Sequence, residues 1–301
     1  HVLSRRQRQM CIRDRFYVAQ LRALSTTRGK YVNLVKGQPK SKDGIDLYSK
    51  KDFEGMHAAG RVAAEILDEI VTSVFPGQTT AKIDAVIEQM IKDKGVESAT
   101  IGYRGYQHAS CISVNRVVCH GIPSDKILKE GDILNIDVTV IKDSWFGDTS
   151  RMYVAGQLSR KAERLIQVTH EALFKGIEAV KPGKTFGDIG HAIQAYVEAN
   201  RMSVVRDFCG HGLGRVFHAP PNVLHYGKAG TGPVIEEGMF FTIEPMVNLG
   251  GPETRVLNDE WTAVTRDKSL SAQFEHSIGV TQDGVEIFTL SPGNRFHPTY
   301  R

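Results

Sequence analysis

Two acidic residues in the middle of the chain could do chemistry together. Asp137 and Asp148 lie in the stretch GDILNIDVTVIKDSWFGDTSRMYV. Its alternation of apolar and polar residues predicts one strand over residues 132–141 and a second strand from Trp145. A two-residue turn at Lys142-Asp143 would place the two acids directly opposite each other, with Cβ atoms about 5 Å apart. Because like charges this close repel, the pair requires a shared proton, a basic side chain or a divalent cation.

The predicted strand separates core residues from chemically active ones. Alternate side chains of a strand point to opposite faces, so the acids belong to a polar face behind an aliphatic one. A solvated hairpin rim with two unrelated acids is the alternative, because a register slip of one residue would separate the pair. The aliphatic face comprises Leu134, Ile136, Val138 and Val140, and the polar face comprises Asn135, Asp137 and Thr139.

An internal repeat links the hairpin to the second half of the chain. Pro76-Gly77-Gln78-Thr79 matches Pro182-Gly183-Lys184-Thr185 at an offset of 106, and each turn lies between two predicted helices. The pattern E-G-x-x-x-x-I-acid occurs twice at an offset of 107, ending at Asp137 and at Glu244. Such a period predicts two similar α/β halves, related by an approximate two-fold axis, with a site between them. The apolar stripes predict helices over residues 49–75, 79–94, 159–180 and 186–200.

The repeat brings further ligands to the same site. If Glu244 corresponds to Asp137, a partner of Asp148 should lie in the last pair of strands, where Glu275 is the available acid. His211, in a Gly-His-Gly turn, is the neutral ligand that fits the pattern. Five oxygen and nitrogen ligands suit two divalent ions about 3.5–4 Å apart, with bridging carboxylates and a bridging hydroxide. This set predicts a hydrolase site.

Composition excludes several classes of protein. No apolar run approaches the about 20 residues needed to cross a bilayer. The formal charge of +4 is unevenly placed, because residues 1–42 hold 11 of the 38 Lys and Arg but only one of the 34 acids. The remainder is mildly acidic, which disfavours specific nucleic-acid binding. The four cysteines lack CxxC spacing, which disfavours a zinc ribbon or a disulfide scaffold and favours a reducing compartment.

The N-terminal segment is expected to stand apart from the rest. We predict a basic extension over residues 1–47 and a single catalytic domain over residues 48–301. The Arg-rich residues 1–28 show no hydrophobic period, and we interpret the extension as disordered or as partly extraneous sequence. An organelle transit peptide is the functional alternative. Nucleic-acid binding through this tail predicts a salt-dependent affinity that is lost when residues 1–42 are deleted.

Five motifs, in order along the chain, resemble those of the type I methionine aminopeptidases. They are VCHGIP, NIDVTVIKDSWFGDTSRM, CGHGLGRVFHAPPNVLHY, FTIEPMVN and SLSAQFEHSIGV, and the resemblance covers residues 48–291. It implies an α+β pita-bread fold, in which two pseudo-two-fold-related halves of antiparallel sheet are covered by two helix pairs. It also implies metal-dependent removal of the N-terminal methionine from newly made polypeptides, preferring a small second residue, by a hydroxide that two metal ions activate.

The resemblance also implies roles for residues of this sequence. Asp148 and Glu275 would bridge the two metals, and Glu244 could carry a proton to the leaving nitrogen. His120 and His218 match two histidines that bind substrate and act in catalysis, one near the P1′ nitrogen and one near the scissile carbonyl. The implied metal ligands are Asp137, Asp148, His211, Glu244 and Glu275, and the implied methionine pocket comprises Tyr103, Tyr106, Cys111, Phe217 and Trp261.

Cofactors and partners follow from the same resemblance. Carboxylate-rich ligation with one histidine accommodates two ions of Mn, Fe, Co or Zn. Asn115, Val117 and Ser271 resemble an auxiliary monovalent-cation site. The expected partners are peptides and proteins with an N-terminal methionine, and the ribosome is a further candidate; no membrane or specific nucleic acid is expected. We expect a monomer in the cytoplasm, or in an organelle matrix if the extension is a transit peptide.

The sequence departs from the family pattern at one pocket position and leaves two rivals. Thr100 stands where many bacterial relatives carry a further pocket cysteine. A prolidase or aminopeptidase P is the rival within the fold, and the stretch GRVFHAPPNVLHY together with Trp261 disfavours it. A binding protein that has lost the chemistry is the rival of another class. The sequence retains all five implied metal ligands, which disfavours a binding protein without catalytic activity.

Overall fold

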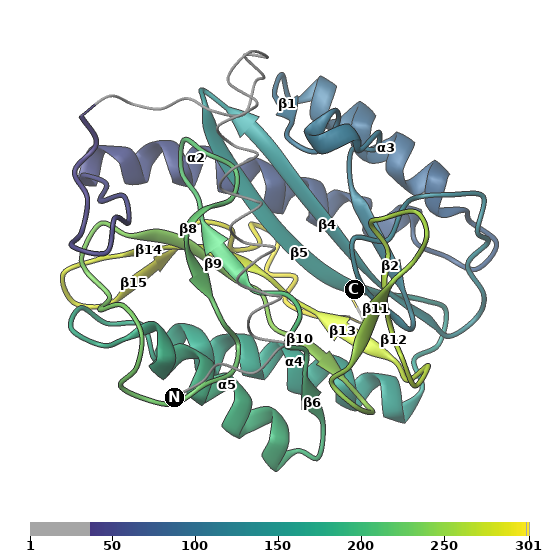
Figure 1. The fold of residues 1–301 in the computed structure, drawn as a ribbon. Helices are drawn as coiled ribbons and strands as arrows, with labels where there is room; N and C mark the ends of the chain where they lie inside the picture. The colour runs from purple at the N-terminus through teal and green to yellow at the C-terminus, as the bar shows by residue number, and fades with distance from the viewer. Residues whose placement is uncertain (1–36, 299, 301) are drawn as a thin grey trace. The chain divides into compact units, whose positions relative to one another are not determined.

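The computed structural model describes residues 37–298 and residue 300, which form an α+β fold of antiparallel sheets and helices (Figure 1). In this part of the chain no helix combines the length and the apolar character needed to cross a membrane. The four predicted helices are confirmed, except that the last turn of the first one tightens into a 3₁₀ helix. The helices of the described residues are α2 (Lys50–Glu69), η1 (Ile70–Ser73), α3 (Thr80–Asp93), η2 (Tyr103–Gly105), α4 (Arg160–Glu178) and α5 (Phe186–Ala199).

Helix α2 begins where the sequence predicts a capped start. Ser49 and Asp52 form a capping box, in which the Ser49 backbone N–H donates to Asp52 Oδ2 at 2.8 Å. The box satisfies backbone donors that an uncapped helix end leaves without partners. Helix α5 begins in the same way, with Thr185 and Asp188. In the repeat α5 corresponds to α3, whose start is also capped by a threonine, Thr79, which accepts the N–H of Lys82 at 3.3 Å.

The central hairpin consists of β4 (Asp132–Lys142) and β5 (Trp145–Ala155). Its turn is Asp143-Ser144, whose φ angles of 49° and 66° are both left-handed, as a two-residue type I′ turn requires. The predicted turn at Lys142-Asp143 is therefore wrong by one residue. Lys142 remains in the strand and pairs with Trp145.

The position of the turn changes the register of the acids but not their face. Asp137 pairs with Ser150, and Asp148 pairs with Thr139, so the prediction that the two acids lie directly opposite each other is wrong. Each predicted partner is displaced by two residues, which preserves the face because strand side chains alternate with a period of two. The acids are diagonal neighbours on one face, within reach of a shared cation.

The opposite face of β4 builds the core of the first half. Leu134, Ile136, Val138 and Val140 are fully buried against apolar residues of α2 and α3, as predicted. Strand β5 approaches helix α2 closely at Gly147, where an added Cβ would lie 2.3 Å from the carbonyl oxygen of Ala59. Glycine is required there because only a residue without a side chain allows this approach.

The remaining strands form three further sheets, and backbone contacts join the two halves at the site. Glu275 pairs with Ser150 through an isolated bridge, in which the Glu275 N–H donates to the Ser150 carbonyl at 3.1 Å. The sheets have the orders β1-β4-β2 with β5 on β4, β13-β10-β6, β11-β12-β3 and β15-β14-β9-β7-β8. The other strands are β1 (Glu97–Ser98), β2 (Cys111–Val114), β3 (Val117–Cys119), β6 (Ser203–Val204), β7 (Gly210–Gly212), β8 (Ala219–Val223), β9 (Phe240–Ile243), β10 (Met246–Asn248), β11 (Thr254–Val256), β12 (Ala263–Thr265), β13 (Ser271–Gln273), β14 (His276–Val280) and β15 (Val285–Ile287).

The internal repeat appears in the structure as two similar halves, which confirms the predicted pita-bread arrangement. In Figure 1 the pair α2 and α3 lies on one side of the strands and the pair α4 and α5 lies on the other. The N–H of Gly77 donates to the Leu128 carbonyl at 2.8 Å, and the N–H of Gly183 donates to the Ile235 carbonyl at 2.9 Å. In each half, therefore, a backbone hydrogen bond connects the turn before the second helix to the segment that precedes the ligand-bearing strand.

The predicted boundary at residue 47 stays a prediction. Residues 1–36, on which the interpretation of the basic extension mainly rests, lie outside the described residues. In the described part of the extension, Ile45 is buried in the core that α4 and α5 also line. The N–H of Tyr48 donates to the Gly238 carbonyl at 2.8 Å.

Candidate metal centre

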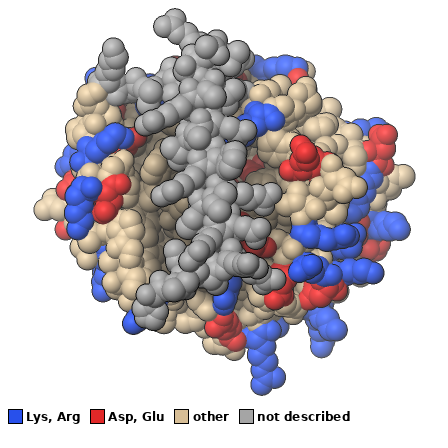
Figure 2. Space-filling model, in the orientation of Figure 1, with Lys and Arg blue, Asp and Glu red and all other residues tan. Residues whose placement is uncertain are grey.

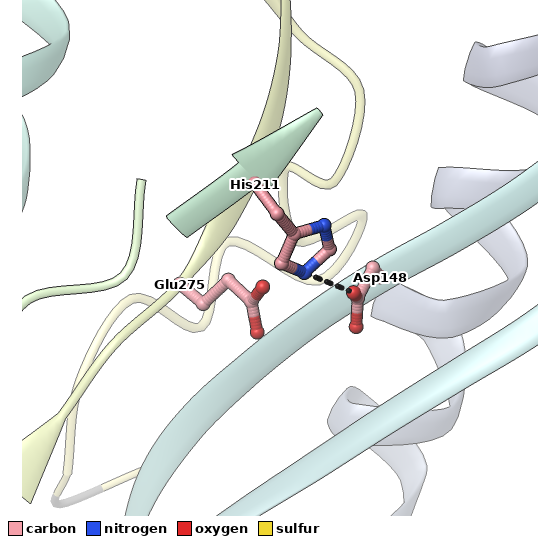
Figure 3. A group of neighbouring side chains, drawn as sticks. All are labelled: Asp148, His211 and Glu275. Carbon is pink, nitrogen blue, oxygen red and sulfur yellow. Dashed lines mark ion pairs between the residues drawn. The ribbon is translucent and has the colours of Figure 1, made fainter. Parts of the chain in front are cut away.

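Three ligand-type side chains from distant parts of the chain converge between the halves. Asp148 comes from β5, His211 from β7, and Glu275 immediately precedes β14 (Figure 3). One ligand atom of each residue lies within 4.8 Å of the ligand atoms of the other two, and all three residues are buried. His211 Nε2 is 3.5 Å from Asp148 Oδ2. The structure therefore assembles three of the five predicted ligands into one cluster.

The other two predicted ligands border this cluster. Glu244 follows β9 directly, and its Oε1 is 3.7 Å from His211 Nε2. Asp137 is the diagonal neighbour of Asp148 on β4, and the charges of Asp148 and Glu244 both act on its carboxyl group. All five candidate side chains thus face one region, and two of them come from the first half and three from the second.

The imidazole of His211 is oriented for metal binding. Its Nδ1 lies 3.1 Å from the carbonyl oxygen of Gly212, and an Nδ1–H donor at that position leaves the Nε2 lone pair facing the acids. A hydrogen bond of this kind commonly fixes the tautomer of a metal-binding histidine. Nε2 is also the atom closest to Asp148 and Glu244, so it is the nitrogen available to a shared ion.

Threonine hydroxyls hold the carboxylates in place. Thr139 Oγ1 donates to Asp148 Oδ1 at 2.7 Å, and Thr242 Oγ1 donates to Glu244 Oε1 at 2.7 Å. Thr242 also accepts the backbone N–H of His211 at 3.0 Å, so it contacts two of the candidate ligands at once. Thr139 lies on the polar face that the sequence predicts for β4, but its role was not identified there.

Two further residues that hold a candidate ligand in place are not predicted from the sequence. Gln273 Nε2 donates to Glu244 Oε2 at 3.2 Å, and the Glu244 N–H donates to His225 Nε2 at 3.1 Å. Strand alternation offers a signal for Gln273, because it is two residues before Glu275 and shares its face. The sequence offers no comparable signal for His225, which is fully buried and reaches Glu244 only through the fold.

The electrostatics of the cluster call for a cation. Burial, reinforced by the charges of Asp148 and Glu244, raises the pKa of Asp137 and of Glu275 well above the usual range, and burial raises the pKa of Glu244 to about 7. Burial opposes protonation of His211, but its contacts with Asp148 and Glu244 raise its pKa overall. Among the described residues no lysine or arginine pairs with these acids. The chemistry of this donor set therefore fits divalent metal ions.

Two histidines beside the cluster combine unusual backbone geometry with neutral side chains. His120 and His218 have φ angles of 55° and 62°, a region that residues other than glycine seldom adopt outside functional sites. The ring centroid of His218 lies 4.2 Å from that of His211. Burial lowers the pKa of His120 to about 4 and that of His218 well below its usual value. Both imidazoles are therefore neutral at pH 7.

Aromatic side chains line the region beside these histidines. The Tyr103 ring centroid lies 4.9 Å from that of Phe217 and 5.3 Å from that of His218. The Tyr106 ring lies 4.9 Å from that of Trp261, which in turn is 6.3 Å from the ring of His120. These contacts form two groups, each containing one histidine.

The remaining predicted pocket residue and the predicted cation site lie on β2 and next to it. Cys111 is buried and pairs with Asp137 across β2 and β4, so its side chain shares the face of the acids. Asn115 adopts a left-handed φ of 57° after β2, and its carbonyl accepts the N–H of Ser271 at 2.9 Å. Val117 begins β3. The structure brings Asn115 and Ser271 together, and their role in binding a monovalent cation stays a prediction.

Four carboxyl groups, two of them buried and two partly buried, and one oriented imidazole, set between two similar α/β halves, define a metal-dependent hydrolase of the pita-bread fold. The chain belongs to metallopeptidase family M24, whose sequence profile matches residues 54–282.

Named relatives show which members of this family the chain resembles. The chain is 55% identical over 257 residues to a methionine aminopeptidase from Rickettsia prowazekii, a match covering 85% of this chain and 99% of the relative. It is 51% identical over 248 residues to the methionine aminopeptidase of Escherichia coli K12, covering 82% of this chain and 94% of that one. The crystal structure of the Rickettsia prowazekii methionine aminopeptidase superposes with a TM-score of 0.81 at 56% identity, covering 82% of this chain and all of that one. The resemblance stated from the motifs is confirmed.

Proposed function

We propose that the protein is a metal-dependent aminopeptidase that removes the N-terminal methionine from peptides and newly made proteins. The observation that carries the proposal is the convergence of Asp148, His211 and Glu275, with Glu244 beside them, next to an aromatic wall. Relatives that share more than half of the aligned residues bear the name of this activity. The acid cluster and the aromatic wall together are the features expected of a peptidase that recognises a long apolar side chain at a free amino terminus.

Two divalent ions would be held by the five candidate ligands, among which Asp148, His211 and Glu275 lie closest together. Mn, Fe, Co and Zn all suit this donor set, in which four carboxylates accompany a single imidazole. When bound, such ions supply Lewis-acid polarisation of the scissile carbonyl and lower the pKa of a water molecule. The protein supplies a buried, water-poor setting in which these electrostatic effects are strong.

The neutral histidines act on the substrate. His218, beside His211, would donate an imidazole N–H to the oxygen of the scissile carbonyl as negative charge develops there. His120, on the other side of the aromatic wall, would contact the P1′ nitrogen. Glu244, beside His211 in the cluster, would receive a proton and pass it to the leaving nitrogen.

The aromatic wall would select methionine. An unbranched thioether fits an apolar, partly aromatic site, and sulfur makes favourable contacts with ring edges. The acid cluster would also fix the register, because the free amino group of the substrate is attracted to it and only one residue fits between amine and scissile bond. We propose a preference for a small second residue. The wall comprises Tyr103, Tyr106, Cys111, Phe217 and Trp261, with His120 and His218 at its margins.

An auxiliary monovalent cation would be bound near Asn115, Val117 and Ser271. The left-handed conformation of Asn115 and its contact with Ser271 bring the end of β2 against β13, in the sheet neighbouring the ligand strands. Carbonyl oxygens of such irregular backbone are suitable ligands for an alkali ion. Its expected role is to stabilise this junction.

The protein would act on peptide and protein amino termini as a monomer, and the ribosome is a candidate partner. Cationic and anionic side chains are interspersed over the described surface seen in Figure 2, which supports the expectation of no specific nucleic-acid site.

We propose the cytoplasm as the location of the protein, with an organelle matrix as the alternative. Residues 48–301 would form the catalytic domain, and Ile45 of the preceding extension packs into its core.

The test measures release of the first residue from Met-Ala-Ser and from Ala-Pro-Phe by chelator-stripped protein resupplied with Mn²⁺ or Co²⁺. We expect methionine release that depends on added metal, and no cleavage before proline. Preferential cleavage of Ala-Pro-Phe would assign a prolidase-type activity instead. No release with any metal, although Mn²⁺ binds, would indicate a binding protein.

A further inference from the structure

The loop that carries two wall tyrosines contains one short 3₁₀ helix, η2 (Tyr103–Gly105), and no longer helix or strand. This pocket loop, residues 99–110, connects β1 to β2 and contains Tyr103 and Tyr106. Its middle turns through left-handed backbone at Gly102, Arg104 and Gly105, with φ angles of 85°, 50° and 89°. A segment of this kind keeps one conformation only if surrounding contacts impose it.

Contacts within the pocket loop fold it onto itself. The N–H of Gly102 donates to the Tyr106 carbonyl at 2.7 Å, and Thr100 Oγ1 donates to the His108 carbonyl at 2.7 Å. The Tyr106 hydroxyl donates to the Ser110 carbonyl at 2.9 Å. These bonds define the shape of the loop. They do not attach it to the rest of the domain.

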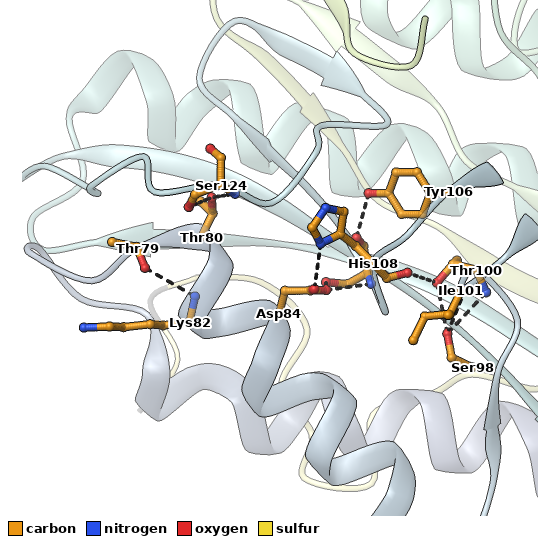
Figure 4. Close-up of polar contacts among 11 residues, drawn as sticks. Thr79, Thr80, Lys82, Asp84, Ser98, Thr100, Ile101, Tyr106, His108 and Ser124 are labelled. Carbon is orange, nitrogen blue, oxygen red and sulfur yellow. Dashed lines mark hydrogen bonds and ion pairs between the residues drawn. The ribbon is translucent and has the colours of Figure 1, made fainter. Parts of the chain in front are cut away.

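A single carboxylate attaches the C-terminal end of the loop to helix α3. Asp84 Oδ1 accepts both the backbone N–H and the hydroxyl of Ser110, at 2.9 and 2.7 Å, and Asp84 Oδ2 lies 3.1 Å from His108 Nδ1 (Figure 4). The N-terminal end is attached separately, because the N–H of Ala99 donates to the Thr139 carbonyl of β4 at 3.0 Å.

Asp84 is buried, which indicates that its role is to accept these hydrogen bonds from the pocket loop. It is 6% exposed and lies beside Ile83 and Ile87 on the inner face of α3. Burial raises the pKa of this carboxyl group, while its hydrogen bonds to Ser110 and His108 oppose that shift. A buried carboxylate is costly unless several donors satisfy it. An ionised carboxylate only accepts, so it can serve both donors of Ser110 and a ring N–H of His108 together.

We propose that Asp84 is a positioning residue, which holds the pocket loop through Ser110 and His108 so that Tyr103 and Tyr106 form the wall for the methionine side chain. This inference rests on the proposed function. The hydrogen bonds of Asp84 are made to the loop and not to the five candidate ligands, so its effect should fall on side-chain recognition and not on the metal-assisted step.

The primary test is Asp84→Asn, which keeps the shape but removes the negative charge and replaces one accepting oxygen with an amide NH₂. We expect KM for Met-Ala-Ser to rise about tenfold, the effect of losing a hydrogen bond to a charged group, with kcat within about twofold. This split is expected because the wall binds ground state and transition state alike. Discrimination between N-terminal methionine and norleucine or leucine should also weaken.

Two variants and two physical measurements control this test. Asp93→Asn makes the same change at an exposed position on the same helix, and its kinetics should match wild type. Ser110→Ala removes the hydroxyl bond but keeps the N–H bond, so it should raise KM by a smaller factor. Hydrogen exchange should show faster exchange of the Ser110 amide and the pocket-loop amides in Asp84→Asn. Mn²⁺ binding by calorimetry should not change.

Each contrary result has a defined meaning. An unchanged KM with an unchanged exchange rate at Ser110 would overturn the proposal, and so would a loss of kcat together with weaker Mn²⁺ binding. If Asp84→Asn does not fold, as judged by circular dichroism, the Ser110→Ala kinetics decide in its place. If wild type releases no methionine with any metal, the proposed function fails. In that case the hydrogen-exchange comparison still decides whether Asp84 holds the loop.

Discussion

The two halves of the site hold their acids in different ways. In the first half, Asp137 and Asp148 stand on one hairpin, whose strands β4 and β5 each run for 11 residues. In the second half, Glu244 follows the four-residue strand β9 and Glu275 precedes the five-residue strand β14. Strands β10 to β13 separate those two acids along the chain. One half is a continuous frame, and the other is assembled from short pieces.

Side-chain hydrogen bonds compensate for the shorter ladders. Glu244 is held by Thr242 and Gln273 through its carboxylate and by His225 through its backbone N–H. Asp148 accepts from Thr139 through its carboxylate and from the Ser277 hydroxyl through its backbone carbonyl, and otherwise relies on the hairpin. The segment between Glu244 and Glu275 also carries Trp261, whereas the hairpin of the first half has only a two-residue turn between its strands. The first half therefore provides rigidity, and the second half adds recognition at the cost of more supporting contacts.

The largest effect should come from removing one acid of each half. Asp148→Asn and Glu275→Gln should each lower kcat/KM by about a thousandfold, because several kcal/mol of metal-dependent charge stabilisation are lost. Asp143→Asn, at the exposed tip of the same hairpin, is the matched control and should leave kcat/KM unchanged. Activity is measured with Met-Ala-Ser at saturating Mn²⁺.

The stability of these variants separates lost chemistry from lost folding. Removing one charge from a group of mutually repelling carboxylates should raise the free energy of unfolding of the metal-free protein. A metal-free Glu275→Gln protein that unfolds more easily than wild type would show that Glu275 has a structural role. It would also contradict the view that these acids are strained without a cation.

Metal binding should stabilise the protein by linking the halves. At a free Mn²⁺ concentration about 100 times the dissociation constant, the free energy of unfolding should rise by about 2.7 kcal/mol. Because His211 and Glu275 come from the second half and Asp148 from the first, the gain should disappear in His211→Ala. Denaturant titrations with and without Mn²⁺ check this, and an equal gain in wild type and His211→Ala would place the bound ion elsewhere.

Sequence reasoning succeeded where periodicity and the repeat act together. The aliphatic face of β4, the capped start of α2 at Ser49 and the correspondence of Asp137 with Glu244 follow from local patterns that the fold preserves. Those patterns also identified Glu275, since the repeat required an acid on the last strands. The register of the hairpin was wrong because the turn position depends on which two residues adopt left-handed φ, and Asp143-Ser144 gives no unique signal.

The supporting contacts could not be predicted for a physical reason. Thr242 reaches both Glu244 and His211, and His225 reaches the Glu244 backbone, only because β7, β8 and β9 form one sheet. Contacts between residues so far apart in sequence depend on strand order, which local periodicity does not encode. The same applies to Asp84, whose partners lie across the fold in the pocket loop.

A matched pair of threonines tests whether the second half needs its side-chain supports more. Thr242→Val and Thr139→Val remove one hydroxyl each without changing shape. Thr242→Val should lower kcat/KM by about 10- to 100-fold, as loss of a residue that orients ligands usually does, and Thr139→Val by less than about tenfold. The reason is that Thr242 contacts both Glu244 and His211, whereas Thr139 contacts Asp148 alone. Equal losses would remove this distinction between the halves.

The smallest effect concerns buried histidines away from the site. In the described part of the first half, the His57 and His108 side chains are 46% and 31% exposed. In the second half, burial lowers the pKa of His170, on α4, to about 4, and the nearby His297 adds to this shift. His276, beside Arg151 and His170, has its pKa lowered by burial to about 3. Apart from His120 at the site itself, these lowered pKa values lie in the second half, which should therefore be the more sensitive to acid.

The sign of this pH dependence follows from proton uptake. Between pH 6.5 and 4 the unfolded chain binds a proton at His170 that the folded protein does not, so stability falls as pH falls through this window. One such group contributes roughly 1.4 kcal/mol per pH unit. His170→Gln should reduce the slope of unfolding free energy against pH by up to that amount, measured by urea titration at several pH values. An unchanged slope would show that His170 binds protons alike in the folded and unfolded protein, and that other buried histidines such as His276 carry the acid sensitivity.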